Sequence, residues 1–484
     1  MRKRSGIIAG MSKIGLISYL KTLFNDRALW RTMLALALPI ALQNLLTSSL
    51  SLIDTVMVGS LGSLSISALG YGSQVTFFAN IVMFGFSSGG AIFVAQYWGN
   101  RDMKGIAKSI GLLLTFNIPV SLLFFCAARF APEFLISIFT EDALAIAEGA
   151  KYLEIASFSY IGVALTQTLS IPLRSTEDVK TPIIASGISV VLNTLLNYCF
   201  INGNFGFPAM GIEGAALATS ISANIAAALL IVICLMRKNI IGKSIKDMFT
   251  FDWSFMKAFL KKSLPVLINE TLWALGVLGF NMVLGRLGTD NYSALTITKT
   301  VENIAFVFYI GICHACNVTV AKNVGAGNIA QAKRHATQFM IIEPVLALLV
   351  GIMVLILRAP ILSLFNISDA ERTVAMALLL IYGIELGARN LPYIAVVGVF
   401  RGGGDSKAGM RYDLTCQWLI ALPAVIISGL ILKLDFVLVY LIMLLFEDIP
   451  KTVLCIRRFK SMKWIMPVTE SGKRALELEL EERV

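Results

Sequence analysis

Long apolar runs, separated by short segments rich in charged and turn-forming residues, follow one another along almost the whole chain. Each run has about 20 residues or more, the length that an α-helix needs to cross the hydrocarbon core of a bilayer. The pattern predicts an all-α polytopic membrane protein with 12 transmembrane helices. The predicted spans lie near residues 32–58, 68–97, 107–131, 150–173, 181–202, 211–236, 263–284, 294–322, 337–358, 374–400, 411–432 and 435–456.

The two halves of the chain resemble each other when the sequence is compared with itself at the offset that brings Pro39 onto Pro265. Because each half holds six spans, the halves form two parallel repeats, and transporters of this kind bind their substrate between the halves near the membrane midplane. The competing interpretation is a duplicated scaffold that transports nothing. The matched pairs are Pro39 and Pro265, Gly59 and Gly285, Gly62 and Gly288, Gly85 and Gly311, Ala95 and Ala321, Gly99 and Gly325 and, with a slip of a single position, Arg174 and Arg401.

The ends of the chain differ from the apolar body. The first residues are basic, and the apolar stretch after them is interrupted by charges, which favours an amphipathic segment on the cytoplasmic membrane surface over a cleavable signal peptide. The acidic residues after Glu470 predict a short solvated tail. The predicted parts are the amphipathic segment 1–30, the N-terminal six-helix lobe 31–240, a cytoplasmic linker 241–262, the C-terminal six-helix lobe 263–458 and a charged cytoplasmic tail 459–484.

Composition and charge support a membrane protein with both termini in the cytoplasm. The chain is 57% hydrophobic and 15% charged, where soluble proteins are roughly 25% charged, and its net charge is +11. Its Lys and Arg residues gather in every second connection between spans, whereas the connections 59–67 and 203–210 are nearly free of them. Since basic loops stay in the cytoplasm, this asymmetry predicts an inner (plasma) membrane protein and removes the reason to expect a nucleic-acid partner.

Enzyme chemistry is not expected. The chain has no phosphate-binding loop for ATP, only two His residues and no pairing of a nucleophile with a base. The seven Cys residues lie singly in apolar segments apart from Cys313 and Cys316, whose spacing is only weak support for a metal or redox site. We expect no cofactor and no ATP hydrolysis.

Polar residues inside the predicted spans of the first half are the first candidates for function. A charge within a span costs several kcal/mol unless it faces protein or water, so Asp54 is a functional candidate by default. Oxygen atoms from a carboxylate, amides and a hydroxyl suit a small hard cation such as Na+, and the same carboxylate could carry H+ instead. The alternative for the amides and the hydroxyl is hydrogen bonding between helices. The candidates are Asp54, Asn193, Asn197 and Thr219 for the cation, with Asn44, Thr47 and Ser51 as a polar stripe on the helical face of Asp54.

The second half has a different set of ionisable residues. Glu270 takes the repeat position of Asn44, and no partner lies near it in the sequence. Glu385 and Arg389 share a helical face with Tyr393 and have the spacing of an ion pair within one helix, as have Lys299 and Glu302. These two pairs are therefore either functional or internally neutralised, and Glu270 is the stronger functional candidate.

Taken together, these features make the chain similar to the multidrug and toxic compound extrusion (MATE) family over residues 31–458. The resemblance implies a V-shaped pair of six-helix lobes that exports amphipathic, often cationic compounds in exchange for Na+ or H+. The segments that carry it are Pro39 to Gly62, Val94-Ala95-Gln96-Tyr97-Trp98-Gly99-Asn100, Val320-Ala321-Lys322-Asn323-Val324-Gly325, Gly211 to Thr219 and Arg401-Gly402-Gly403-Gly404-Asp405.

The resemblance also implies roles for particular residues. Asp54 matches the coupling carboxylate of the first lobe, with Asn193, Asn197 and Thr219 around it, and Glu270 matches the second-lobe glutamate of the NorM-like branch. Two positions depart from the family pattern. Asn197 stands where the DinF-like branch has an aspartate, and Asn390 stands where the NorM-like branch has an acid. These departures leave the choice between Na+ and H+ open.

The resulting prediction is a secondary active antiporter that functions as a monomer and exports small organic cations by alternating access. Trp273 and Tyr393 are aromatic candidates for the substrate cavity, since cations bind to aromatic faces, although Trp273 fits a lipid-facing position equally well. Glu385, Arg389 and Asn390 join Glu270 as second-lobe candidates for cation or substrate binding. The rival predictions are a flippase for lipid-linked oligosaccharides or polysaccharides and a receptor or channel without coupled transport.

Overall fold

The computed structural model describes residues 26–237, 239–363, 365 and 367–482, and these residues form helices joined by short connections. Residues 1–25, which make up most of the predicted amphipathic segment, lie outside the described residues. In the described ranges the only β-structure is one isolated bridge, between Gly404 and Ile465.

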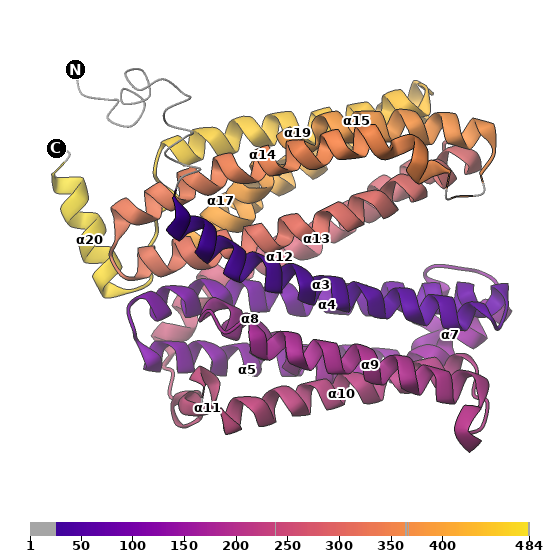
Figure 1. The fold of residues 1–484 in the computed structure, drawn as a ribbon, viewed down its shortest axis with the longest axis horizontal. Coiled ribbons are helices and arrows are strands. Elements are labelled where there is room, and N and C mark those ends of the chain that lie inside the picture. Colours follow the sequence, from indigo (N-terminus) through magenta and orange to yellow (C-terminus); the bar gives the residue numbers. More distant parts are fainter. Residues whose placement is uncertain (1–25, 238, 364, 366, 483–484) are drawn as a thin grey trace.

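The helices fall into two groups that match the two sequence repeats (Figure 1). We call the first group the N lobe and the second the C lobe. The N lobe comprises α3 (Arg27–Gly59), α4 (Ser63–Gly99), α5 (Met103–Phe130), α6 (Pro132–Ser137), α7 (Ala143–Ala156), α8 (Ser159–Ser175), α9 (Lys180–Asn202), η1 (Asn204–Gly206) and α10 (Ile212–Met236). The C lobe comprises α12 (Trp253–Gly285), α13 (Thr289–Gly325), α14 (Ile329–Leu362), α15 (Asp369–Tyr393), η3 (Ile394–Phe400), α16 (Arg401–Gly403), α17 (Ser406–Leu414), η4 (Thr415–Ala421), α18 (Leu422–Ile426), η5 (Ile427–Ile431) and α19 (Phe436–Lys460).

All twelve predicted spans are helical in the described part of the chain, which confirms the predicted fold class. Ten helices there are long and apolar enough to cross a membrane. The predicted fourth span is instead two shorter helices, α7 and α8, which meet at Ser157 and Phe158. The predicted twelfth span is α19, which carries Glu447, Asp448 and Lys451 in its interior. These charged side chains take part in ionic contacts inside the C lobe.

Segments between and after the lobes are more ordered than expected. The predicted linker 241–262 contains α11 (Ile240–Ser244) and η2 (Ile245–Asp247), and α12 begins within it because Asp252 caps the first turn by accepting a hydrogen bond from the Phe255 amide. The predicted solvated tail contains α20 (Glu470–Glu481), which begins at the end of the molecule where the lobes meet (Figure 1). The Ser471 hydroxyl donates to Asn100 of the N lobe at 2.8 Å and to the Gly325 carbonyl of the C lobe at 2.9 Å.

Glycines that repeat in the sequence lie at the contact between the lobes. A Cβ on Gly85 would lie 2.9 Å from the Leu267 Cα, and a Cβ on Gly311 would lie 3.2 Å from the Ala41 Cβ. The two glycines are matched by the repeat offset, and so are their two neighbours, which makes the contacts equivalent under the repeat. The internal duplication therefore specifies a pseudo-twofold contact in which α4 crosses α12 and α13 crosses α3.

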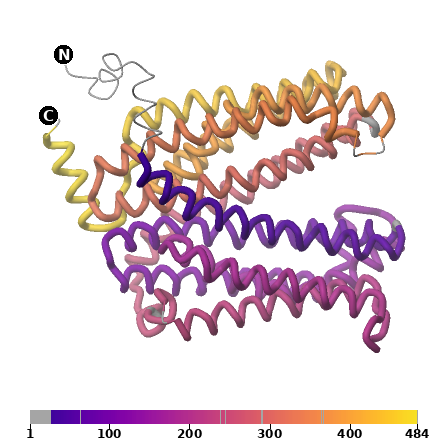
Figure 2. The backbone as a smooth tube through the Cα atoms, viewed as in Figure 1, coloured from indigo at the N-terminus to yellow at the C-terminus, as the bar shows by residue number. Residues whose placement is uncertain are grey.

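A second equivalent pair closes the end of the molecule that holds α20. A Cβ on Gly99 would overlap the Lys322 carbonyl, and a Cβ on Gly325 would overlap the Gln96 carbonyl. Away from this end, α3 and α13 diverge. The first half of the chain, from indigo to magenta, and the second half, from orange to yellow, lie on separate sides (Figures 1 and 2). The lobes therefore form a V that is closed at the α20 end.

The first helix is fixed to the C lobe by its N-cap. Asp26 accepts a hydrogen bond from the Leu29 amide at 3.1 Å, and its other oxygen accepts from Arg334 at 2.8 Å and from Gln338 at 3.1 Å. The Leu29 hydrogen bond, with help from Gln338 and Arg334, lowers the pKa of Asp26 below its ordinary value of 3.8. A lowered pKa means that this stabilisation is present above pH 3.8 and is lost as the pH falls through the lowered value.

Two substitutions of Asp26 distinguish its role as the N-cap of α3 from its ion pair with Arg334. Asp26→Ala is expected to destabilise the protein by about 1 kcal/mol, since alanine cannot cap α3. Asp26→Asn keeps the cap and is expected to cost less, because Arg334 is 60% exposed and its ion pair is screened by solvent. Thermal unfolding in detergent at neutral pH measures both. Equal losses in the two variants would contradict the capping interpretation.

Candidate functional site

The carboxylate of Asp54 lies inside the N lobe and is held by side chains of two other helices. The Asn197 amide on α9 donates to Oδ1 at 2.5 Å, and the Thr219 hydroxyl on α10 donates to Oδ2 at 3.2 Å. Asn193, one turn before Asn197, accepts from the Asn197 amide at 3.1 Å and donates to the Thr219 hydroxyl at 3.2 Å. The structure therefore joins all four predicted residues in one hydrogen-bonded ring.

The chemistry of this ring suits a small cation. Asp54 is 8% exposed, and Asn193 and Asn197 are fully buried. In the described part of the chain no Lys or Arg forms an ion pair with Asp54, so only neutral donors stabilise its charge. The Oδ1 atom of Asn197 is buried without a hydrogen-bond partner. A carboxylate beside an unpartnered amide oxygen provides the oxygen ligands that Na+ takes, and the same carboxylate can instead take a proton.

The polar stripe on α3 is only partly directed at this ring. Thr47 donates to the Gln43 carbonyl of its own helix, and Thr47 and Ser51 are exposed. The Asn44 Nδ2 atom is buried without a hydrogen-bond partner. None of these three side chains hydrogen-bonds to Asp54. The sequence reasoning instead missed Gln43, whose side chain accepts from Arg174 and donates to Ser186, each at 3.0 Å.

Glu270 in the C lobe is not unpaired, contrary to the sequence prediction. Its carboxylate lies 2.6 Å from the Arg401 guanidinium, and Arg401 also donates to Ser88 of the N lobe at 3.2 Å. Arg401 is 3% exposed and lies at the start of α16. The prediction failed because the pair joins α12 to a helix far along the chain, which local spacing cannot reveal.

A second ionic cluster lies deeper in the C lobe, around Arg389. The carboxylates of Glu302, Glu385, Glu447 and Asp448 all interact electrostatically with its guanidinium. Glu385 and Asp448 also act on each other.

Neither of the pairs predicted within one helix forms a direct ion pair in the described part of the chain. Lys299 bonds to Asn281 rather than to Glu302. Glu302 accepts a hydrogen bond from the Tyr440 hydroxyl at 2.8 Å. Both side chains therefore hydrogen-bond to other helices, while Lys299 and Glu302 still interact electrostatically with each other.

Helix α19 supplies the acidic residues that the sequence reasoning missed. Lys451 pairs with Glu447 of the same helix at 3.0 Å and with Asp413 of α17 at 3.2 Å, and Asn269 donates to the other Asp413 oxygen at 3.0 Å. Lys451 itself is buried within α19. The signal that could have revealed this cluster was the pair of acids in the middle of the last apolar run.

The remaining C-lobe candidates occupy varied surroundings. Asn390 is buried and donates to the Leu386 carbonyl of its own helix at 2.8 Å, so it does not replace an acid in an ionic contact. The Tyr393 ring packs against Phe306 with 5.4 Å between centroids, and its hydroxyl interacts electrostatically with Glu270. Trp273 is half-buried, and its main-chain carbonyl accepts from Gln417 at 3.1 Å.

Comparison with known proteins agrees with this architecture. The family model described as MatE matches residues 39–199 and again residues 265–427. The chain belongs to the MatE family. The two matches begin at positions 39 and 265, which are the two prolines paired by the internal repeat, so each lobe of this MatE protein corresponds to one copy of the family unit.

Curated relatives and solved structures extend the similarity over almost the whole chain. The chain is 26% identical over 460 residues to the "Probable multidrug resistance protein NorM" of Thermotoga maritima, which covers 93% of this chain and 96% of that protein. It is 24% identical over 416 residues to the "Multidrug resistance protein MdtK" of Photorhabdus laumondii, covering 83% and 88%. Its fold matches a crystal structure of MATE in the bent conformation with a TM-score of 0.81 and 16% identity, over 96% of this chain and 99% of that one.

Proposed function

We propose that this MatE protein is a secondary active antiporter that exports small organic cations in exchange for Na+ or H+. The observation that carries the proposal is the buried Asp54 carboxylate, which has neutral donors and no cationic partner among the described residues. The names of the NorM and MdtK relatives, which are multidrug resistance proteins, support an organic substrate. A carboxylate kept free of fixed cations is available for a mobile one.

The V shape supports transport by alternating access. The basic connections between spans support a protein of the inner (plasma) membrane with the α20 end and both termini on the cytoplasmic side, where the lobes are then closed. Return to an inward-facing state requires the contacts at Gly99 and Gly325 to separate. Since a ligand shifts a conformational equilibrium only through unequal affinity for the two states, the coupling cation must bind Asp54 more tightly in one of them. One chain contains both lobes, which supports function as a monomer.

Efflux from proteoliposomes tests the proposal. A fluorescent organic cation is loaded, and a Na+ gradient or a pH gradient is imposed separately on the parent, Asp54→Asn, Glu270→Gln and the control Glu133→Gln, whose carboxylate is exposed in α6. We expect flux under at least one gradient to fall at least tenfold in Asp54→Asn and to remain in the control. The gradient that drives flux names the ion.

Other outcomes of the same experiment are equally informative. Flux lost only in Glu270→Gln would move coupling to the C lobe. No flux of folded parent protein under either gradient would contradict antiport of organic cations. The flippase alternative calls for a cationic cavity, and no specific observation favours it, because Arg401 is already paired with Glu270.

A further inference from the structure

Arg174 is a cation of the N lobe that no described acid neutralises. It lies in the last turn of α8, and its Nε atom donates to the Gln43 side chain of α3 at 3.0 Å. Among the described residues its terminal nitrogens, Nη1 and Nη2, have no hydrogen-bond or ion-pair partner, and neither is enclosed, so a ligand can reach them. The nearest acids along the chain are engaged elsewhere. Glu177 pairs with Lys322 at 2.8 Å, and Asp178 accepts hydrogen bonds from the first turn of α9.

A contact beside Arg174 has its counterpart in the C lobe. In the N lobe the Gln43 amide on α3 donates to the Ser186 hydroxyl on α9 at 3.0 Å. In the C lobe the Asn269 amide on α12 donates to the Asp413 carboxylate on α17, also at 3.0 Å. The internal repeat matches these contacts residue by residue, Gln43 with Asn269 and Ser186 with Asp413. The two lobes therefore build this part of the fold in the same way.

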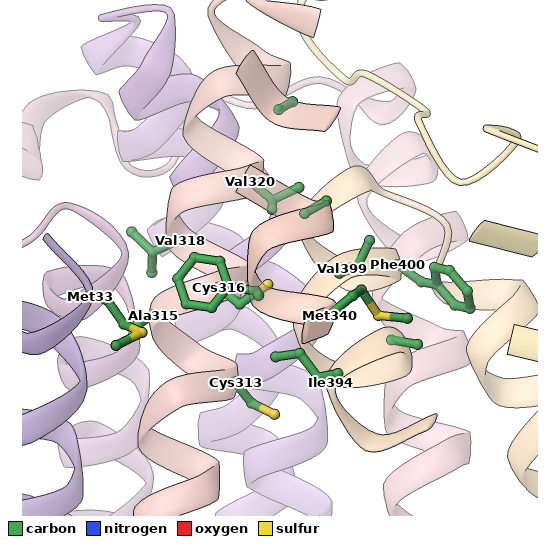
Figure 3. Close-up of a cluster of buried hydrophobic side chains, with 14 of the residues drawn as sticks. Met33, Cys313, Ala315, Cys316, Val318, Val320, Met340, Ile394, Val399 and Phe400 are labelled. Atoms are coloured by element: carbon green, nitrogen blue, oxygen red, sulfur yellow. The ribbon is translucent and has the colours of Figure 1, made fainter. Parts of the chain in front are cut away.

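Apolar packing holds Arg174 and its repeat counterpart Arg401 in equivalent positions. The residues that precede them, Leu173 and Phe400, are matched by the repeat and are both fully buried. Figure 3 shows Phe400 with Val399 in an apolar cluster of the C lobe, and Leu173 belongs to an apolar cluster of the N lobe. Because the preceding side chain is fixed in such a cluster, the backbone of each arginine is fixed as well.

The lobes differ in the acids that surround the arginine. Glu270 pairs with Arg401 at 2.6 Å in the C lobe, whereas the same repeat position of the N lobe is Asn44. The Asn44 Nδ2 atom is a buried donor without a hydrogen-bond partner among the described residues. Ser186 likewise takes the place of an acid, Asp413. The N lobe thus contains the arginine of this arrangement without either carboxylate.

A guanidinium group with free terminal nitrogens suits an oxyanion. Its planar N–H groups match the two oxygens of a carboxylate or phosphate group, and the resulting hydrogen bonds are strong because both partners are charged. A partly buried cation without a partner is unfavourable, and a bound anion removes that cost. Asp54 lies 11 positions after Gln43 on α3, which is about 17 Å along the helix axis. The proposed cation site is therefore separate, and both sites can be occupied together.

We propose that Arg174 binds an oxyanion, the carboxylate or phosphate group of a ligand, in the place that Glu270 fills in the C lobe. This group is either the acidic part of an exported zwitterion or a free inorganic anion. For an organic ligand the inference rests on the proposed function, whose substrate class it extends from cations to zwitterions. A single unpaired arginine is not the cationic cavity that a flippase calls for.

A matched pair of dyes tests for the acidic group of an organic ligand. Rhodamine 110 carries a free carboxylate, and rhodamine 123 is its methyl ester with the same cationic ring system. Fluorescence anisotropy in detergent measures the binding of each dye to the parent, Arg174→Gln and the control Arg129→Gln, whose ion pair with Glu154 is exposed. We expect Arg174→Gln to weaken rhodamine 110 binding at least tenfold and to change rhodamine 123 binding less than threefold, because a charge-assisted hydrogen bond is lost only with the free acid. The control should bind both dyes as the parent does.

A second variant separates the charge of Arg174 from the folding of the protein. Asn44→Glu places a carboxylate at the repeat position of Glu270, where it should pair with Arg174 and weaken rhodamine 110 binding as strongly as Arg174→Gln does. Because this substitution gives an unpaired cation a partner, its unfolding temperature is expected to equal or exceed that of the parent. Rhodamine 110 binding at parental strength in both variants would contradict a carboxylate site at Arg174.

Inorganic phosphate distinguishes a free anion from the acidic group of a substrate. Its effect on the unfolding temperature is measured at constant ionic strength for the parent, Arg174→Gln and the control. A rise that disappears only in Arg174→Gln, with the binding of both dyes unchanged, would identify a free anion as the ligand. If Arg174→Gln responds to phosphate and to both dyes as the parent does, the inference is wrong. If the parent binds neither dye, the proposed function is contradicted, and the phosphate measurement still decides whether Arg174 binds an anion.

Discussion

Gly99→Ala and Gly325→Ala are expected to open the closed end of the V. In each variant the added methyl group overlaps a main-chain carbonyl of the other lobe, that of Lys322 or of Gln96. A backbone carbonyl on a packed helix cannot move aside as a flexible side chain can, and overpacking of this kind costs about 1–3 kcal/mol. Because the clash exists only while the lobes touch here, the cost falls on the closed state alone. The equilibrium should shift by about 5-fold to 150-fold.

Distances between spin labels measure this shift. Lys104 on α5 and Ala330 on α14 are exposed near the closed end and accept labels once the more accessible cysteines, Cys126 and Cys199, are replaced. We expect a population at longer distance in both glycine variants. Gly70→Ala is the matched control on α4, since its added Cβ meets no atom within 4 Å. Unchanged distances in Gly99→Ala would show that the contact does not control the conformational equilibrium.

The same glycines show what could be predicted from the sequence. Helices of the right number follow from apolar runs of membrane length, and the pseudo-twofold contact follows from glycines that repeat at a fixed offset. The members of the Asp54 ring were also predictable as candidates, because polar residues stand out inside apolar spans and Asn193 and Asn197 are one helical turn apart. In each case the signal is local or periodic along the chain.

The ionic contacts of the C lobe could not be predicted in this way. Arg401 pairs with Glu270, and Lys451 pairs with Asp413, each on a different helix. The periodicity of the sequence does not show which helices lie side by side. Glu343 and Asp448 lie inside predicted spans and were missed, although a charge within a span faces protein or water and could have singled them out. What the sequence lacked was the partner of each charge, and the partner decides whether an acid is paired, protonated or free for a ligand.

Lys451→Met is expected to be strongly destabilising, because it removes the cationic partner of two carboxylates. Lys451 is buried and neutralises both Glu447 and Asp413, at 3.0 and 3.2 Å. Methionine keeps much of the side-chain volume but leaves two carboxylates without their cation, beside the acids that already surround Arg389. Removing one partner from a buried ionic contact costs about 3–5 kcal/mol, whereas a charge-neutral replacement of the whole contact is often tolerated.

Neutralising the acids together with Lys451 should therefore restore the stability that Lys451→Met alone removes. Lys451→Met alone should lower the yield of monodisperse protein and its unfolding temperature in detergent, while the triple variant Lys451→Met, Glu447→Gln, Asp413→Asn should recover most of both. Lys473→Met provides the contrast, because its ion pair with Glu470 is solvent-exposed on α20 and such pairs contribute little. A triple variant as unstable as Lys451→Met would mean that Lys451 acts through packing of its aliphatic chain. Recovery would mean that α19 tolerates its interior charges only as a neutral set, unlike Asp54, whose carboxylate is held by the neutral donors Asn197 and Thr219.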